Sequence, residues 1–288
     1  MKLSQCVPGI VFIMFVPIVS IASQQGTLSW AGCGVSKKSF MNELASAYTK
    51  KTGIKINLQG GGATRGIRDA VTNKLDIGAS CRINLPRADK SEFYASLYPV
   101  AWDALVAITH KSNTVTNLTS EQIKAIYLGK ITNWKEVGGS DVPIDLYIRR
   151  GKLSGVGYAI RQYFFKDSRM DFKSKYIVRS SIPLEKAVEK DPYAFGITGI
   201  SSAMKRQLHL LNIDNKTPSL ENIKNGTYAY FRPLYLVSNA QPSIQVRKFI
   251  HFARSAEGRQ IIRDSGTIPY MDASQLLSKM LIYGFDVR

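Results

Sequence analysis

The amino-acid sequence predicts an α/β protein built mainly on parallel sheets. Strand and helix patterns alternate along the chain, the connections between them are short, and several expected strands end in glycine-containing turns. Strands are expected at 26–31, 54–58 and 75–79, with helices at 36–51 and after residue 66. Because parallel neighbours need a crossover between them, this order indicates a parallel sheet with helices on its faces.

The helix expected at 36–51 has its apolar residues at helical spacing. Phe40 and Leu44 fall on one face of it, and Gly53 follows, as is common where a helix ends. The later turn at 60–66 contains four glycines and leads into the next expected helix. These two helices connect the first three strands.

The middle of the chain continues the alternation. Thr119-Ser120-Glu121-Gln122 is a capping box, which predicts the start of a helix. Further elements are expected at these residues: strands at 104–108, 144–148, 194–198 and 232–237, and helices at 184–189 and 245–264. A first α/β unit, a middle section and a late return strand predict two lobes joined by two crossings, near 102–109 and 231–238.

The charge of the chain favours anionic partners. The 288 residues include 39 Lys and Arg against 21 Asp and Glu, which gives a formal net charge of +18. Small anions, nucleic acid and lipid head groups all remain open, because charge alone does not choose among them. An apolar content of 44% excludes low-complexity disorder. No heptad run or longer repeat is found, which excludes coiled coils and solenoids.

The first 22 residues have the features of a secretory signal. Lys2 supplies a positive charge, residues 8–21 are almost wholly apolar, and Ser20 and Ala22 suit the small positions of a cleavage site. No later apolar stretch has the length needed to span a membrane. We therefore predict cleavage after Ala22 and export of the remaining chain.

Removal of the signal leaves two cysteines, Cys33 and Cys81. Two cysteines in an exported chain are candidates for a disulfide. The histidines are isolated in the sequence, and no Cys/His spacing typical of a metal site occurs. We therefore predict neither a metal nor a cofactor.

Four turns follow expected strands, which is where ligands bind in open parallel sheets. They lie at 32–37, 60–65, 80–82 and 149–157. Their glycines let the backbone approach a ligand closely, and the first N–H groups of the following helix are unpaired donors. Arg149, Arg150 and Lys152 add positive charge. Together these turns predict an oxyanion held between the lobes.

Other interpretations of the same residues remain open. Each turn alone is typical of a tight connection without a ligand, and adjacent arginines are typical of a solvated surface. Nucleotide-binding fingerprints and a nucleophile elbow are missing, and Ser154 has no His or carboxylate in a partner motif. One alternative is an exported phosphatase-like enzyme that uses the same basic pocket. Another, a nucleic-acid or lipid-binding surface, needs aromatic residues interleaved with Lys and Arg.

Several segments carry a family resemblance. The most specific are Ala47-Tyr48-Thr49-Lys50-Lys51-Thr52-Gly53, Leu75-Asp76-Ile77-Gly78-Ala79-Ser80 and Ile126-Tyr127-Leu128-Gly129-Lys130-Ile131-Thr132-Asn133-Trp134. With them the chain resembles the periplasmic phosphate-binding proteins of ABC transporters, the PstS-type family, over about residues 26–272. The resemblance implies a two-lobed periplasmic-binding-protein fold of type II and a binding role rather than an enzymatic one.

The resemblance also implies how the chain is organised and what it binds. Lobe 1 is expected to contain residues 23–104 and 235–288, and lobe 2 residues 105–234. The expected partners are inorganic phosphate, or a similar oxyanion, and an inner-membrane ABC permease. We further expect a monomer in the periplasm that does not bind nucleic acid.

The ligand shell implied by the resemblance has members in all four turns. They are Gly34, Val35, Ser36, Ala63, Thr64, Cys81, Arg150, Ser154, Gly155 and Val156. Where the family has an aspartate, which accepts the proton of hydrogen phosphate, this chain has Cys81. Val156 likewise replaces a threonine. A different anion, sulfate-like or organic, therefore stays open beside phosphate.

The same alignment gives the cysteines a role. In this family the first and third strands are neighbours, so the turns that contain Cys33 and Cys81 emerge side by side. Neighbouring strands are about 4.8 Å apart, which suits the separation of disulfide-bonded cysteines. The resemblance therefore implies a disulfide between Cys33 and Cys81 at the rim of the pocket.

Overall fold

The computed structural model describes residues 26–282 of the chain, and the predicted signal, residues 1–22, lies outside the described residues. The strands are β1 (Thr27–Gly32), β2 (Lys55–Gln59), β3 (Ile77–Ser80), β4 (Ser96–His110), β5 (Asn117–Leu118), β6 (Asp145–Arg149), β7 (Tyr176–Val178), β8 (Ala194–Gly199), β9 (Leu208–Ile213), β10 (Phe231–Ser238) and β11 (Ile268–Pro269). The helices are α1 (Gly34–Ser36), α2 (Asn42–Thr52), α3 (Gly62–Val71), α4 (Ser120–Tyr127), α5 (Gly155–Ile160), α6 (Ser181–Val188), α7 (Ile200–Ala203), α8 (Leu220–Lys224), α9 (Ile244–Arg254), α10 (Ala256–Asp264) and α11 (Gln275–Ile282).

A single curled sheet runs through the molecule in the order β2-β1-β3-β10-β4-β8-β6-β7, with helices packed on it. Its outer pairs are parallel: β1 pairs with β2 and β3, and β6 pairs with β7 and β8. The central strands β4 and β10 are antiparallel to their neighbours. The α/β fold class predicted from the sequence is therefore confirmed, with parallel pairing at both ends of the sheet and antiparallel pairing in its middle.

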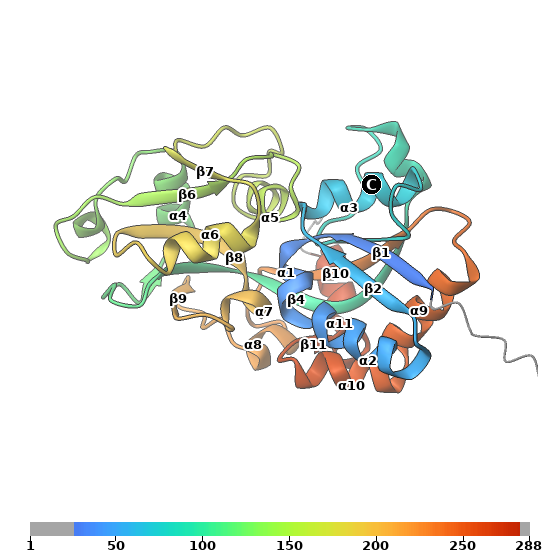
Figure 1. Cartoon of the computed structure of the whole chain (residues 1–288). Coiled ribbons are helices and arrows are strands. Elements are labelled where there is room, and N and C mark those ends of the chain that lie inside the picture. The colour runs from blue at the N-terminus through green and yellow to red at the C-terminus, as the bar shows by residue number, and fades with distance from the viewer. Residues whose placement is uncertain (1–25, 283–288) are drawn as a thin grey trace, which may run out of the picture.

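Strand β4 connects the two halves of the sheet. Its first part pairs with β10, as far as Ala104 opposite Phe231, and its last part pairs with β8 from Leu105 opposite Gly199. In Figure 1 the N-terminal and C-terminal segments lie together around the first part of this strand, and the middle of the chain lies around its last part. Strand β4 therefore contains both the short strand expected at 104–108 and the chain crossing expected near 102–109.

Most elements lie where local signals place them. Helix α2 ends at Gly53, which has a left-handed φ of 75° and donates its N–H to the carbonyl oxygen of Thr49. The capping box at the start of α4 is formed: Gln122 N–H donates to Thr119 Oγ1 at 3.1 Å, and Thr119 N–H donates to Gln122 Oε1 at 2.8 Å. Both sequence predictions are confirmed.

The single helix expected at 245–264 is wrong. The structure has two helices, α9 and α10, separated at Ser255, which has an extended ψ of 171°. Ser255 Oγ accepts a hydrogen bond from the N–H of Gly258 and so caps the second helix. A Cβ on Gly258 would lie closer than 3.0 Å to the carbonyl oxygen of Phe252, so this glycine permits the tight bend.

Helix α3 packs unusually close to the sheet. A Cβ added to Gly66 in α3 or to Gly78 in β3 would lie closer than 3.0 Å to backbone atoms of the other element. This backbone contact fixes the start of α3 beside the ends of β1 and β3, and the same region faces α5 in the other half (Figure 1). Within residues 26–282, no helix combines the length and the apolar character needed to cross a membrane.

Candidate anion-binding site

A cavity of about 730 Å³ lies where α3 meets the turns that follow β6 and β7. It is lined by Gly61, Gly62, Ala63, Thr64, Arg68, Arg149, Arg150, Gly151, Lys152, Leu153, Ser154, Arg179, Ser180 and Pro183. Five of these residues are cationic and none is acidic. The cavity is therefore suited to a negatively charged ligand.

Two turns from opposite halves of the sheet line this cavity. Gly61 and Gly62 have φ values of 145° and 83°, which favour glycine, and they lead directly into α3. On the other side, Ser154 Oγ accepts a hydrogen bond from the N–H of Gly157 at 3.1 Å and caps α5. Thr64 Oγ1 donates to the carbonyl oxygen of Leu153 at 3.0 Å, so the two turns are in direct contact.

Arg149 is the most deeply placed cation of the cavity wall. Only 6% of the residue is exposed, and burial lowers the pKa of its guanidinium. Nη1 donates to Ser181 Oγ at 2.8 Å, and Nη2 donates to the carbonyl oxygen of Arg179 at 3.0 Å. Its Nε is buried and has no hydrogen-bond partner among the described residues. A buried N–H without a partner is costly, and the residue that carries it also lines this basic cavity.

The outer cations differ in how far they are neutralised. Arg68 forms ion pairs with Asp89 and Glu92, and Lys152 pairs with Asp171 at 2.7 Å. Arg150 and Arg179 are exposed and form no ion pair within residues 26–282. The charge available to a ligand therefore comes mainly from Arg149 at the end of β6 and from Arg150 and Arg179, which follow β6 and β7.

Comparison with known proteins places the chain in a family. A model described as "PBP superfamily domain" matches residues 22–257, which is most of the chain. This chain belongs to the PBP superfamily. The solved structures agree, and the periplasmic-binding-protein fold class predicted from the sequence is confirmed.

Two phosphate-binding proteins resemble this chain along most of its length. Phosphate-binding protein PstS of Borreliella burgdorferi is 27% identical over 237 residues, which cover 78% of this chain and 84% of that protein. The protein of the same name from Bacillus subtilis is 25% identical and covers 83% and 80%. The predicted resemblance to PstS-type proteins is confirmed.

Solved PBP superfamily structures have the same arrangement. A putative phosphate ABC transporter substrate-binding protein with bound phosphate from Clostridium perfringens is 28% identical, with a TM-score of 0.76 over 85% of this chain and 99% of that one. An ABC-type phosphate transport receptor from Vibrio cholerae is 27% identical, with a TM-score of 0.65 over 85% and 100%.

The structure divides the ligand shell implied by the PstS-type resemblance into two groups. Ala63, Thr64, Arg150 and Ser154 line the cavity. The remaining members are buried and do not line it: Gly34, Val35, Ser36, Cys81, Gly155 and Val156. The turns that carry all ten residues do meet between the two halves of the sheet.

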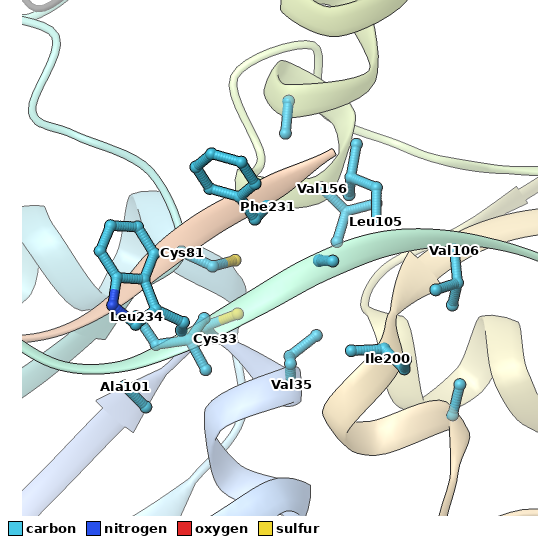
Figure 2. Close-up of a cluster of buried hydrophobic side chains, with 14 of the residues drawn as sticks. Cys33, Val35, Cys81, Ala101, Leu105, Val106, Val156, Ile200, Phe231 and Leu234 are labelled. Carbon is cyan, nitrogen blue, oxygen red and sulfur yellow. The ribbon is translucent and has the colours of Figure 1, made fainter. Parts of the chain in front are cut away.

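The inner part of this meeting place contains many apolar side chains, beside the buried ion pair of Arg232 and Asp103. Figure 2 shows Val35, Cys81 and Val156 in a cluster of buried hydrophobic side chains that also includes Leu105 and Phe231. These side chains offer an anion no charge and few hydrogen-bond donors. The open space of the site is the outer cavity, which Thr64, Ser154 and the arginines line.

The cysteines are neighbours, as the resemblance implies, but the structure does not contain the expected disulfide. Cys33 and Cys81 are free, buried thiols, and a hydrogen bond joins their side chains. That bond, together with the charge of nearby Arg232, lowers the pKa of Cys81 to about 7, whereas burial raises the pKa of Cys33. The thiol pair therefore satisfies its own polar groups within the apolar cluster.

The ligand shell expected from the sequence includes Arg150 but not Arg149. In β6 the alternate residues Leu146 and Ile148 are buried, and continuing this alternation would bury Arg150. The alternation breaks at the end of the strand, so Arg149 is buried and Arg150 is exposed. Arg179 gave no signal, because it follows a strand of three residues that the sequence did not reveal.

Proposed function

We propose that this chain is an exported solute-binding protein that binds inorganic phosphate or a similar oxyanion and delivers it to an ABC permease. The observation that carries the proposal is the buried guanidinium of Arg149, whose Nε lacks a partner in the wall of a basic cavity. The names of the PstS-type relatives support phosphate as the ligand. The signal expected at residues 1–22 supports export to the periplasm.

The proposed ligand contacts are side chains on both sides of the cavity. The hydroxyl of Ser154 is the donor on one side, Thr64 lines the other side with its hydroxyl proton donated to Leu153, and Arg149 lies at the deeper end. Arg150 adds charge at the rim. Charge-assisted hydrogen bonds of this kind are about twice as strong as neutral ones, which is why a few of them are sufficient to hold an oxyanion.

A binding role is favoured over catalysis by what lines the cavity. It contains no His, Cys, Asp or Glu that would act as a nucleophile or as a general acid or base. The residues between 26 and 282 likewise hold no group of three or more potential metal ligands. These features of the described residues support a binding role for the cavity.

The proposed working motion is closure of two lobes around the ligand. We infer that residues 23–104 with 235–288 form one lobe and residues 105–234 the other. The change of partner along β4, between Ala104 and Leu105, supports this division.

Both turns of the site come from the same chain, so a monomer is sufficient to form the site. The cavity lining has no aromatic residue on which a nucleic-acid base would stack.

The test is a comparison of binding and turnover in the mature protein. Phosphate should raise the melting temperature in a concentration-dependent way, because a ligand that binds only the folded state stabilises it. Arg149→Gln should abolish this shift, while Arg259→Gln, in a separate pocket beside Tyr98 and His251, should retain it. Release of phosphate from an ester would instead indicate an enzyme. No shift with any oxyanion would refute the proposal.

A further inference from the structure

The cavity of the candidate site is larger than a single oxyanion requires. Its volume of about 730 Å³ lies in the range of roughly 300–1,000 Å³ that is typical of pockets for small organic ligands. The apolar cluster at Val35, Cys81 and Val156 fills the inner part of the site. The free volume therefore extends outward from Arg149, toward the rim.

The cavity also carries more positive charge than one phosphate group neutralises. Arg149, Arg150 and Arg179 have no ion-pair partner among the described residues, and no carboxylate lines the cavity. A phosphate group at pH 7 carries about −1.5 to −2 charges. At least one of these three guanidinium groups would therefore lack a counter-charge if a single phosphate were bound.

The three arginines lie at two depths. Arg149 is buried, while Arg150 and Arg179 are exposed at the rim. The two levels are adjacent, because Nη2 of Arg149 donates to the main-chain carbonyl oxygen of Arg179 at 3.0 Å. An anionic group at Arg149 and a second one at the rim would therefore belong to one short ligand.

We propose that this site prefers an anion with two or more linked oxyanion groups, a diphosphate or a short polyphosphate, over inorganic phosphate. The inference rests on the function proposed above and names its ligand class. The inner group binds at Arg149 with the hydroxyl of Ser154, beside Thr64. The next group along the ligand binds at Arg150 and Arg179, and the ligand leaves chemically unchanged.

The test is isothermal titration of the mature protein with inorganic phosphate, diphosphate, tripolyphosphate, sulfate and glycerol phosphate. Each additional charge-assisted contact is expected to tighten binding at least about tenfold, so diphosphate should bind at least about tenfold more tightly than phosphate. Arg179→Gln should reduce this ratio severalfold, since it removes a rim contact. Arg259→Gln removes the same charge outside the cavity and should leave the ratio unchanged.

The possible results separate this inference from the proposed function. Phosphate that binds as tightly as diphosphate would overturn the inference and leave the proposed function standing. A ratio unchanged in Arg179→Gln would also overturn it, as would glycerol phosphate that matches diphosphate, because size and not charge would then explain the preference. If no oxyanion binds at all, the proposed function fails, and the inference fails with it.

Discussion

Substitution of Gly155 by alanine tests how closely the two halves of the molecule must meet. Gly155 is the first residue of α5, and the nearest atoms to it belong to the other half of the sheet. A Cβ at this position would lie well under 3.0 Å from Cys81 Sγ and 3.1 Å from Ala63 Cβ. Real Cβ atoms essentially never approach so closely, so one of the two halves must move.

The expected loss of affinity in Gly155→Ala follows from the position of the clash. Alanine fits the helical backbone better than glycine does, so the cost comes from overpacking, which is about 1–3 kcal/mol. Because the clash lies between the halves, it is relieved most easily when they separate, and separation opposes ligand binding. If the cost falls on binding, about 1–3 kcal/mol corresponds to roughly 5- to 150-fold weaker affinity.

A double-mutant cycle isolates this contact. Cys81→Ala removes the Sγ atom that Gly155→Ala would meet, so the two changes together should bind the anion much as Cys81→Ala alone does. Affinities for phosphate by titration calorimetry, with melting temperatures as a control for folding, measure the cycle. Normal affinity in Gly155→Ala, or a double mutant as weak as Gly155→Ala, would refute the reasoning.

Three further predictions concern stability and thiol chemistry. Burial favours the neutral form of Glu92, but the hydrogen bonds and charge of Arg82 keep its pKa below the ordinary value. Glu92→Gln should therefore lower the free energy of unfolding by about 3–5 kcal/mol in a denaturant titration at pH 7. This difference between the variant and the original protein should shrink as the pH falls through the lowered pKa. An equal loss at all pH values would contradict this. Ser255→Ala should lower the free energy of unfolding by about 0.5–2 kcal/mol, since it removes the cap of α10; an unchanged melting curve would contradict the capping role. The two buried thiols predict that the mature protein, unfolded without reductant, reacts with two equivalents of a thiol reagent, whereas reaction only after reduction would show a disulfide.

The parts of the fold that depend on local sequence could be predicted. The strands near Trp30 and Ile77 and the capping box at Thr119 follow from alternation and from side-chain chemistry within a few residues. The break at Ser255 could not be predicted in the same way, because the amphipathic pattern of α9 continues into α10. That break depends on the Ser255 cap and on the close approach of Gly258 to Phe252, six residues earlier, and the spacing of apolar residues reveals neither.

In the candidate site, too, some features could be predicted from the local sequence and others could not. Thr64 and Ser154 line the cavity because both follow strands in turns that begin helices, and this placement is visible in the sequence. A resemblance transfers positions rather than side-chain chemistry, and Val35 and Val156 consequently lie in an apolar cluster. The direction of Arg149 depends on how β6 ends, so only the folded structure reveals it.

A crystal structure of the mature protein soaked with arsenate, with anomalous data collected for arsenic, tests the central claim most directly. We predict an anomalous peak in the cavity, within hydrogen-bond distance of the Arg149 guanidinium and bordered by Thr64 and Ser154. A peak that lies outside this cavity, or a cavity that stays empty at saturating arsenate, would contradict the claim.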